Sequence, residues 1–439
     1  MGKRWVVLVA ALVVVTAACG NATDGNGEAK GSSSGAGGPT GTASAADLQK
    51  KVPSTEVGVT DDAIRIGGVA SKTNALGAPY DQAALGAQAF FDMVNSQGGI
   101  YGRKLELVAN RDDQMVNNQA EVQGLISQDK VFAIAPVMSL LFTGADTAAT
   151  EGIPTFGWNI NQQWTGPPNL FGEKGSALCI DCAHPVQPWL SQKNGFKKIA
   201  LLTYAVDQSK ICAKGVTESF KKWPTAEIAY EDTSIPFGAT DLSVTVQKMK
   251  DAGVDLVVTC MDTNGVTTLA KEMKRQGVNA PQYLQNGYDY DLLSKFGDLF
   301  EGSFVLTGFT PMEVSQPPKG LQDYFTWIDK TPGAKRGELS LAGWLSAALL
   351  YRGLVGAGPE FTRDKVVNAI NQITDWDADG IITGVDWTRA HTSEGGDYCF
   401  AITKIEGSKF VPQYGEPGKP FLCLSPTDPN LNPNPTPQA

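Results

Sequence analysis

The strongest constraint on the fold is a short, wholly apolar run that lies between two helical patterns. Residues 131–135, Val-Phe-Ala-Ile-Ala, would carry apolar side chains on both faces of a strand, so both faces need cover. Residues 64–69 form a similar strand, and Leu105 and Leu107 mark another by alternation. We therefore expect a parallel sheet with crossover helices packed on each side.

Helices between these strands are indicated by apolar residues three or four positions apart. The first is marked by Ala84, Ala87, Phe91 and Val94 and the second by Val122, Leu125 and Ile126. Residues 140–153 and 153–157 complete the series as a helix and a fourth strand. A second series of alternating strands and helices occupies residues 198–285, which predicts a second lobe of like fold.

The chain continues beyond the second series. Helical patterns follow at residues 321–330, 339–355 and 363–373, and strands at 304–308, 399–405 and 410–412. These elements are too many for one lobe to absorb. We therefore expect the chain to return to the first lobe and to cross again, which agrees with a length of 439 residues.

Charge and motifs exclude several classes of function. The formal net charge is −10, and an acidic surface repels phosphate backbones, so no nucleic acid partner is expected. The sequence contains no Gly-x-Ser-x-Gly elbow, no phosphate-loop motif and no recognisable triad of catalytic residues. Gly98 and Gly99 follow a helix, whereas phosphate cradles precede one. We expect no enzyme, no cofactor and no bound metal.

The N-terminus is typical of an exported protein. Lys3 and Arg4 precede the apolar residues 5–15, and small residues then lead to Cys19. This ending resembles a bacterial lipobox, although Thr16 stands where Leu or Val is commoner. Residues 1–19 are therefore predicted to be a lipoprotein signal peptide, with lipid on the Cys19 thiol as the membrane anchor. The alternative is an ordinary signal peptide with an incidental cysteine.

Both ends of the mature chain have compositions that disfavour a packed core. Residues 20–56 are rich in Gly and Ser and are predicted to be a flexible linker. Residues 425–439 are rich in Pro and Asn and are predicted to be a disordered tail.

Four segments resemble the periplasmic-type (type I) solute-binding proteins of ABC transporters, in the branched-chain amino-acid and amide-binding family. These are residues 95–104, 112–114, 125–133 and 398–412. The resemblance implies an α/β fold with two doubly wound parallel-sheet lobes joined by a three-strand hinge, a Venus flytrap that closes on its ligand. It implies crossings near residues 175, 307 and 380, with lobe 1 at 57–178 and 308–380 and lobe 2 at 179–307 and 381–424.

Loops beyond the carboxyl ends of parallel strands are the expected ligand site. The candidate ligand-binding residues in these loops are Tyr80, Ser139, Trp158, Asn159, Tyr204, Asp207, Met261, Asp262, Asn286, Tyr288 and Asp289. The resemblance implies that Ser139, Trp158 and Asn159 hold a carboxylate. It implies that Met261 and Asp262, with residues 287–289, meet the amino group and the far end of the ligand.

Each of these side chains also has a purely structural interpretation. Tyr80, Trp158 and Tyr288 could form an aromatic wall for an apolar group or a cation, or could simply pack where the lobes meet. Asp262 and Asp289 could neutralise an ammonium group, or could cap helices or lie in solvent. Leu140 and Leu141 follow Ser139 where amino-acid binders tend to have more hydroxyl groups, which argues against an ordinary leucine or valine pocket.

Cysteine usage fits an oxidising compartment. Seven cysteines less Cys19 leave six, which allow fifteen pairings. Expected strand neighbours suggest the pairs Cys399 with Cys423 and Cys212 with Cys260, which leaves Cys179 with Cys182. A redox motif or a zinc site remains an alternative for Cys179-x-x-Cys182, with His184 nearby but no evident fourth ligand.

Taken together, these features predict a monomeric, extracytoplasmic protein, anchored by lipid to the outer face of the bacterial cell membrane. It would capture a small polar organic molecule, such as an amino acid, an amide or a related compound, and deliver it to ABC permease subunits. Two alternatives remain: a sensor domain read by a membrane signalling partner, and an exported enzyme with an unrecognised site.

Overall fold

Two β-sheets form the framework of the computed structural model, which describes residues 45–74, 76–285, 287–393 and 398–434. The strands of lobe 1 are β1 (Ala63–Ala70), β2 (Lys104–Asp112), β3 (Ala133–Met138), β4 (Thr155–Gly157) and β5 (Leu170–Gly172). They form a sheet in the order β2-β1-β3-β4-β5, in which all neighbouring strands are parallel. The expected parallel sheet of lobe 1 is therefore confirmed.

The sheet of lobe 2 is larger and mixed. Its strands are β6 (Lys198–Tyr204), β7 (Glu227–Ile235), β8 (Leu256–Cys260), β9 (Gln282–Leu284), β10 (Phe304–Thr307), β11 (Tyr398–Glu406), β12 (Lys409–Gln413), β13 (Leu422–Leu424) and β14 (Pro433–Asn434). Strands β7, β6, β8, β9 and β10 are parallel neighbours in that order. Strands β11, β13 and β14 extend the sheet in antiparallel pairs, and β12 pairs with β11.

Helices cover the sheets as the apolar periodicity predicts. In lobe 1 they are α1 (Ala45–Leu48), α2 (Gln82–Ser96), α3 (Asn118–Ser127), α4 (Ala145–Thr150), α10 (Lys319–Ile328), α11 (Glu338–Ala357) and α12 (Arg363–Ile370). In lobe 2 they are α5 (Val186–Asn194), α6 (Asp207–Lys222), α7 (Ser243–Ala252), α8 (Thr263–Gln276) and α9 (Tyr290–Phe296). Both lobes belong to one compact unit of the chain.

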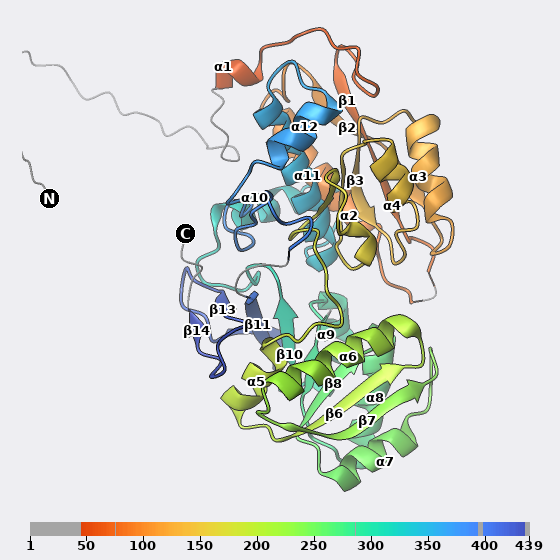
Figure 1. Ribbon diagram of the computed structural model, residues 1–439, viewed down its shortest axis with the longest axis vertical. Helices are drawn as coiled ribbons and strands as arrows, with labels where there is room; N and C mark the ends of the chain where they lie inside the picture. The colour runs from red at the N-terminus through yellow and green to blue at the C-terminus, as the bar shows by residue number, and fades with distance from the viewer. Residues whose placement is uncertain (1–44, 75, 286, 394–397, 435–439) are drawn as a thin grey trace, which may run out of the picture. The chain divides into compact units, whose positions relative to one another are not determined.

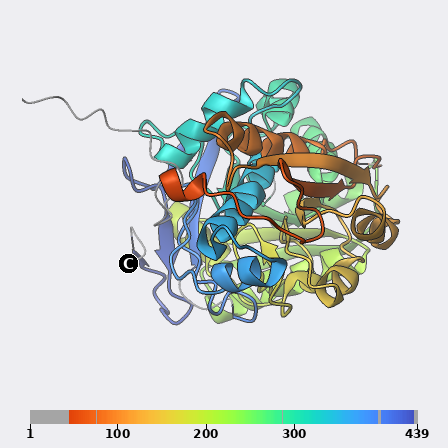
Figure 2. The ribbon, with the colours of Figure 1, turned by 90° about the horizontal axis from the view of Figure 1, so that it is seen from above.

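The chain returns to lobe 1 after β10, as expected. Figure 1 shows α10, α11 and α12 in blue-green and blue beside the red-to-yellow elements of lobe 1, and Figure 2 shows α11 beside α2 again. Helix α11 is apolar and long enough to cross a membrane, but 83% of its most apolar window is buried inside the protein. Helix α11 is therefore the core helix of lobe 1 and not a membrane-spanning segment.

Helices α2 and α11 touch through their backbones. A Cβ atom at Gly86 would collide with the carbonyl oxygen of Ser340, and one at Gly343 would collide with that of Ala83. Only glycine permits this approach from both sides. One turn further along, the ring of Phe90 meets the edge of Trp344 at a centroid distance of 5.0 Å. The glycine pair thus sets how closely the two helices pack and where their N-termini lie.

Two boundaries differ from the sequence prediction. Residues 381–393 were assigned to lobe 2, but Trp387 packs edge-on against Phe171 of β5, and His391 bonds Asn371 at 2.8 Å. Burial of these large rings holds the segment on lobe 1. The predicted third helix at 140–153 is shorter, because the N-H of Gly144 donates to the side chain of Asn118 and α4 begins only at Ala145.

Both predicted flexible ends contribute to the folded part. Within the predicted linker, Val52 accepts a hydrogen bond of 2.8 Å from the guanidinium group of Arg103, which is only 2% exposed. Within the predicted tail, Leu431 is buried in the core of lobe 2, and β14 pairs with β13. The tail is therefore ordered at least as far as residue 434, because it completes a sheet edge. Cys19 and residues 435–439 lie outside the described residues.

Gly343→Ala should destabilise lobe 1 because its Cβ would force α2 and α11 apart. Overpacking of this kind costs roughly 1–3 kcal/mol of unfolding free energy. The measurement is urea denaturation followed by circular dichroism, with Gly86→Ala as a second test of the same contact. Gly384→Ala is the control, since the nearest atoms to its Cβ lie 3.9 Å away. Equal stabilities for Gly343→Ala and Gly384→Ala would contradict the close crossing.

Candidate functional site

The predicted loops gather where the carboxyl edges of the two sheets meet. In lobe 1, Tyr80 follows β1 through a loop, Ser139 follows β3 directly, and Trp158 follows β4. In lobe 2, Tyr204 ends β6 and Asp262 follows β8. Because parallel strands end at one edge of their sheet, each lobe brings its own loops together.

Contacts link the loops of one lobe with those of the other. The side-chain amide of Asn264 at the start of α8 donates to the carbonyl of Leu76 in the β1–α2 loop, at 3.0 Å. Burial raises the pKa of Tyr80 to about 12, and the charge of Asp262 contributes to the rise. The β1–α2 loop of lobe 1 therefore contacts the first turn of α8 in lobe 2, the helix that Asp262 caps.

An aromatic pair forms the lobe 1 side of this region. The rings of Tyr80 and Trp158 lie 5.9 Å apart at a tilt of 38°. Both side chains belong to a small apolar cluster with Ala70, Met138 and Ala342, and Leu339 packs against it. Two of the three side chains proposed for an aromatic wall are thus brought together. Tyr80 comes from the loop before α2, and Leu339 from the first turn of α11.

Asp262 is the carboxylate of the lobe 2 side. Its Oδ1 atom accepts a hydrogen bond of 2.5 Å from the Tyr204 hydroxyl and one of 3.1 Å from the N-H of Gly265. The second bond caps helix α8. A side chain at position 265 would collide with the Tyr204 hydroxyl, so glycine is needed there. For Oδ2 the structure shows no hydrogen bond to the described residues, which leaves that oxygen available to another donor.

Ser139 and Asn159 face structural partners rather than open space. The Ser139 hydroxyl accepts from Asn118, which also donates to Asp113, and all three residues are buried. Asn159 donates from its N-H to Glu173 at 2.8 Å and from its side chain to the carbonyl of Gly175 at 2.7 Å. Their hydrogen bonds fix the loops that carry the aromatic pair. Any contact they make with a ligand would have to be added to these bonds.

The remaining lobe 2 candidates do not share one environment. The Tyr288 ring stacks on Phe410 at 4.3 Å, and its hydroxyl donates to Glu313, so this ring is enclosed by protein. Asp289 caps α9 by accepting from the N-H of Asp291 at 2.8 Å. Asp207 is exposed in the first turn of α6. Met261 is half-buried beside the core, and Asn286 lies outside the described residues.

The sequence analysis did not predict a group of charged side chains that lies at the first crossing between the lobes. Glu173 is buried and pairs with the ammonium group of Lys174 at 3.3 Å. Glu338, the first residue of α11, lies in the field of Lys174, Glu173 and Asp289. Burial raises the pKa of Glu338 to about 7; Lys174 opposes the rise, and Glu173 and Asp289 add to it.

These three residues gave little sequence signal. Glu173 and Lys174 follow β5, a three-residue strand that apolar patterning does not distinguish from a loop. Glu338 heads a helix whose apolar run suggested only a core. An acidic residue in the first turn of a buried helix that follows a crossing was the available clue.

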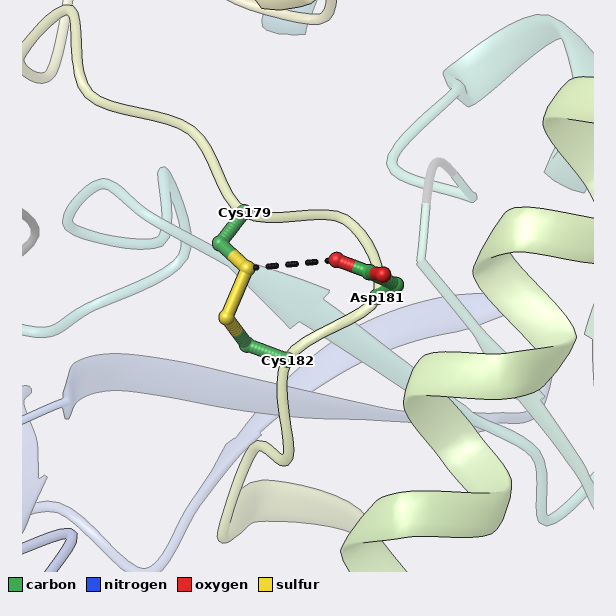
Figure 3. A group of neighbouring side chains, drawn as sticks. All are labelled: Cys179, Asp181 and Cys182. Carbon is green, nitrogen blue, oxygen red and sulfur yellow. Dashed lines mark hydrogen bonds between the residues drawn. A yellow bond between two sulfur atoms is a disulfide. The ribbon is translucent and has the colours of Figure 1, made fainter.

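All three expected disulfides are present in the structure: Cys179–Cys182, Cys212–Cys260 and Cys399–Cys423. The last joins residues that are directly opposite in the β11–β13 pair. Figure 3 shows the first, with Asp181 Oδ1 3.4 Å from the Cys179 sulfur. These ligand-type atoms lie within 4.8 Å of one another, but both sulfurs are joined in the disulfide. In this form they offer no thiolate to a metal.

A cavity of about 420 Å³ lies elsewhere on lobe 1. Phe90, Trp344, Arg352, Asp375 and Asp377 are among its lining residues. None of the predicted ligand-binding residues lines it. Its lining comes from α2, α10, α11 and residues 373–379, whereas the candidate residues belong to loops at the carboxyl edges.

A known family of proteins shares the sequence pattern of this chain. The sequence pattern of the family described as periplasmic binding protein matches residues 63–409. No curated protein matches the chain in sequence.

Several solved structures share the fold. The fatty acid ABC transporter substrate-binding protein from Thermomonospora curvata superposes with a TM-score of 0.68 at 20% identity, over 82% of this chain and 93% of that chain. The branched-chain amino acid transporter substrate binding protein from Streptococcus pneumoniae, in complex with isoleucine, gives 0.66 at 19% identity, over 80% and 100%. A solute binding protein from R. palustris in complex with benzoate gives 0.63 at 17% identity, over 80% and 95%.

Glu338 should make stability depend on pH in a characteristic way. Its pKa in the folded chain lies above the value of roughly 4.3 expected in the unfolded chain, so between these values the folded state binds more protons. Its contribution is present below about pH 4.3 and is lost as the pH rises to about 7. The thermal midpoint of the wild type should therefore fall relative to that of Glu338→Gln across this range and run parallel above it.

Differential scanning fluorimetry at a series of pH values measures this difference. Glu360→Gln serves as the matched control, because Glu360 is exposed and lies just beyond the far end of α11, which ends at Ala357. A midpoint difference between the wild type and Glu338→Gln that stays constant from pH 4 to pH 8 would show that Glu338 titrates normally.

Proposed function

The chain belongs to the periplasmic binding protein family, and from that premise we propose that it captures a small polar organic solute between its lobes and delivers it to an ABC permease. The family and the structural neighbours are binding proteins rather than enzymes. The function therefore consists of binding and conformational change, with no covalent step.

One observation carries the proposal: aromatic side chains of lobe 1 and a carboxylate of lobe 2 lie together at the carboxyl edges of the sheets. Tyr80 and Trp158 supply the aromatic faces, and Asp262 retains a carboxylate oxygen without a hydrogen bond to the described residues. A solute that touches both sides gains contacts only when the lobes approach. It therefore favours the closed arrangement by the difference in its affinity for the two states.

The class of solute is narrowed by neighbours and by the site. Related proteins of the fold carry isoleucine, valine or benzoate in their solved structures. Trp158 and Tyr80 offer flat apolar faces, and Asp262 offers an acceptor. We propose an amino acid, an amide or a related compound with an apolar portion as the solute.

Membrane attachment is part of the proposal. The basic residues and apolar run before Cys19 support an exported lipoprotein, held at the outer face of the cell membrane. We propose that it acts there as a monomer. By composition, residues 20–44 would tether the folded part of the chain to the membrane. This location would keep the binding protein close to its permease.

Binding of the correct solute should raise the thermal midpoint of the protein. A ligand that binds only the folded state adds RT ln(1 + [L]/Kd), which is about 2.7 kcal/mol at a hundredfold excess over Kd. The measurement is a thermal-shift screen of the mature chain with amino acids, amides, urea-like compounds and aromatic acids. Trp158→Ala and Asp262→Asn should each abolish the shift given by the solute that is found.

Asp61→Asn is the control for this screen, because Asp61 is exposed and precedes the amino end of β1, whereas the loop with Tyr80 follows the carboxyl end of that strand. It should retain the full shift. A screen in which no solute of these classes stabilises the protein would contradict the proposed function.

A further inference from the structure

We propose that the solute carries a positive charge, as an ammonium or amidinium group beside an apolar part, and that Glu338 determines this specificity by pairing with it. The inference rests on the proposed function and names the substrate class of the same site. It follows from which charges near the site already have partners and which do not.

Positive groups close to Glu338 are already engaged. Lys174 lies 3.3 Å from the buried carboxylate of Glu173. Lys335 and Arg336, the residues that shortly precede Glu338, pair with Asp291 at 2.7 Å and with Asp329 at 2.5 Å. Each of these cations therefore already has a carboxylate partner.

Negative groups are less fully engaged. Glu173 accepts from the N-H of Asn159 as well as from Lys174, and Asp289 accepts from the first N-H groups of α9. For the Glu338 carboxylate, in contrast, the structure shows no hydrogen bond or close ion pair with the residues that it describes. Its interaction with Lys174 is only the electrostatic attraction of a nearby charge. Asp262 likewise keeps one oxygen atom without such a partner. Glu338 of lobe 1 and Asp262 of lobe 2 therefore each retain an oxygen atom that can accept from a cationic group.

The position of Glu338 relative to the aromatic pair fits a cation. Leu339, the next residue, packs against the cluster that contains Tyr80 and Trp158. The carboxylate thus begins the helix whose first turn touches the aromatic wall. A cation is favoured both by a carboxylate and by the face of an aromatic ring. An apolar substituent on the same solute would cover the remaining ring surface.

Electrostatics at two scales supports this assignment. The whole chain carries a formal net charge of −10, which steers cations rather than anions toward it. Locally, burial together with Glu173 and Asp289 raises the pKa of Glu338 to about 7, although Lys174 opposes the rise. A bound cation would favour the ionised form of Glu338 and relieve this crowding of carboxylates.

A carboxylate in the first turn of α11 also has a simple structural interpretation, since it favours the positive end of the helix dipole. That role would affect stability alone. A role in specificity would affect the choice between charged solutes, so the test must measure binding and not only folding.

The experiment compares matched solutes by isothermal titration calorimetry on the mature chain. The pairs are benzylamine with benzoate, n-butylamine with butyrate, and leucine amide with leucine. We expect the amine or amide member of at least one pair to bind at least tenfold more tightly than its acid. Glu338→Gln should weaken that binding by about tenfold or more, as loss of a charged hydrogen bond does. Glu360→Gln should leave it unchanged.

The pH dependence of the affinity for the amine is a second measurement. A purely structural role of Glu338 would not change it. Affinity of the wild type for the amine should rise from pH 6 to pH 8 as Glu338 ionises, and Glu338→Gln should lose this rise. Tighter binding of the acids, or binding of the amines that is equal in wild type and Glu338→Gln, would overturn the inference and leave solute binding intact. Failure of all solutes, including those of the wider thermal-shift screen, would instead overturn the proposed function itself.

Discussion

The close crossing of α2 and α11 is the contact on which the geometry of the site depends. Gly86 and Gly343 let each backbone reach the other, so the helices pack at a separation that no larger residue would permit. Two residues of the lobe 1 side of the site lie at the N-termini of these helices: Tyr80 comes just before α2, and Glu338 begins α11. Residues more than 250 positions apart in the chain are thereby held at one edge of the sheet.

Around this contact, most hydrogen bonds of the polar side chains are made to other groups of the protein. Asn118 and Asp113 hold Ser139, Glu173 holds the backbone of Asn159, and Gly265 and Tyr204 hold Asp262. Such bonds fix the loops before any solute arrives, which reduces the ordering that binding requires. Among the described residues, the groups that remain for a solute include the aromatic surface, the second oxygen of Asp262 and the Glu338 carboxylate.

Much of the fold could be predicted from the sequence, because apolar periodicity reports local structure directly. Strand β6 begins and ends at the residues expected, 198 and 204, and the long helices fall within a few residues of their predicted bounds. Expected neighbours in the sheet also suggested the disulfides, since Cys212 and Cys260 both lie at the carboxyl edge. Segments with little periodicity were harder. Strand β5 has three residues, and residues 381–393 are held on lobe 1 by the burial of Trp387.

The site was predicted less completely than the fold, for a physical reason. Sequence can place a residue in a loop after a strand, as it did for Tyr80, Trp158 and Asp262, but side-chain direction depends on partners far along the chain. Tyr288 is turned into the protein by Glu313 and Phe410, and Glu338 becomes a candidate only because of Lys174 and Asp289. The resemblance to family motifs was enough to predict which loops form the site. The charged group at the first crossing could be recognised only from the three-dimensional structure.

The most direct test of the account is a crystal structure of the protein with its solute bound. The account predicts one unmodified solute in contact with Trp158 and Tyr80 of lobe 1 and with Asp262 of lobe 2. A solute that contacts one lobe only, or that occupies the cavity lined by Trp344 and Arg352, would contradict it.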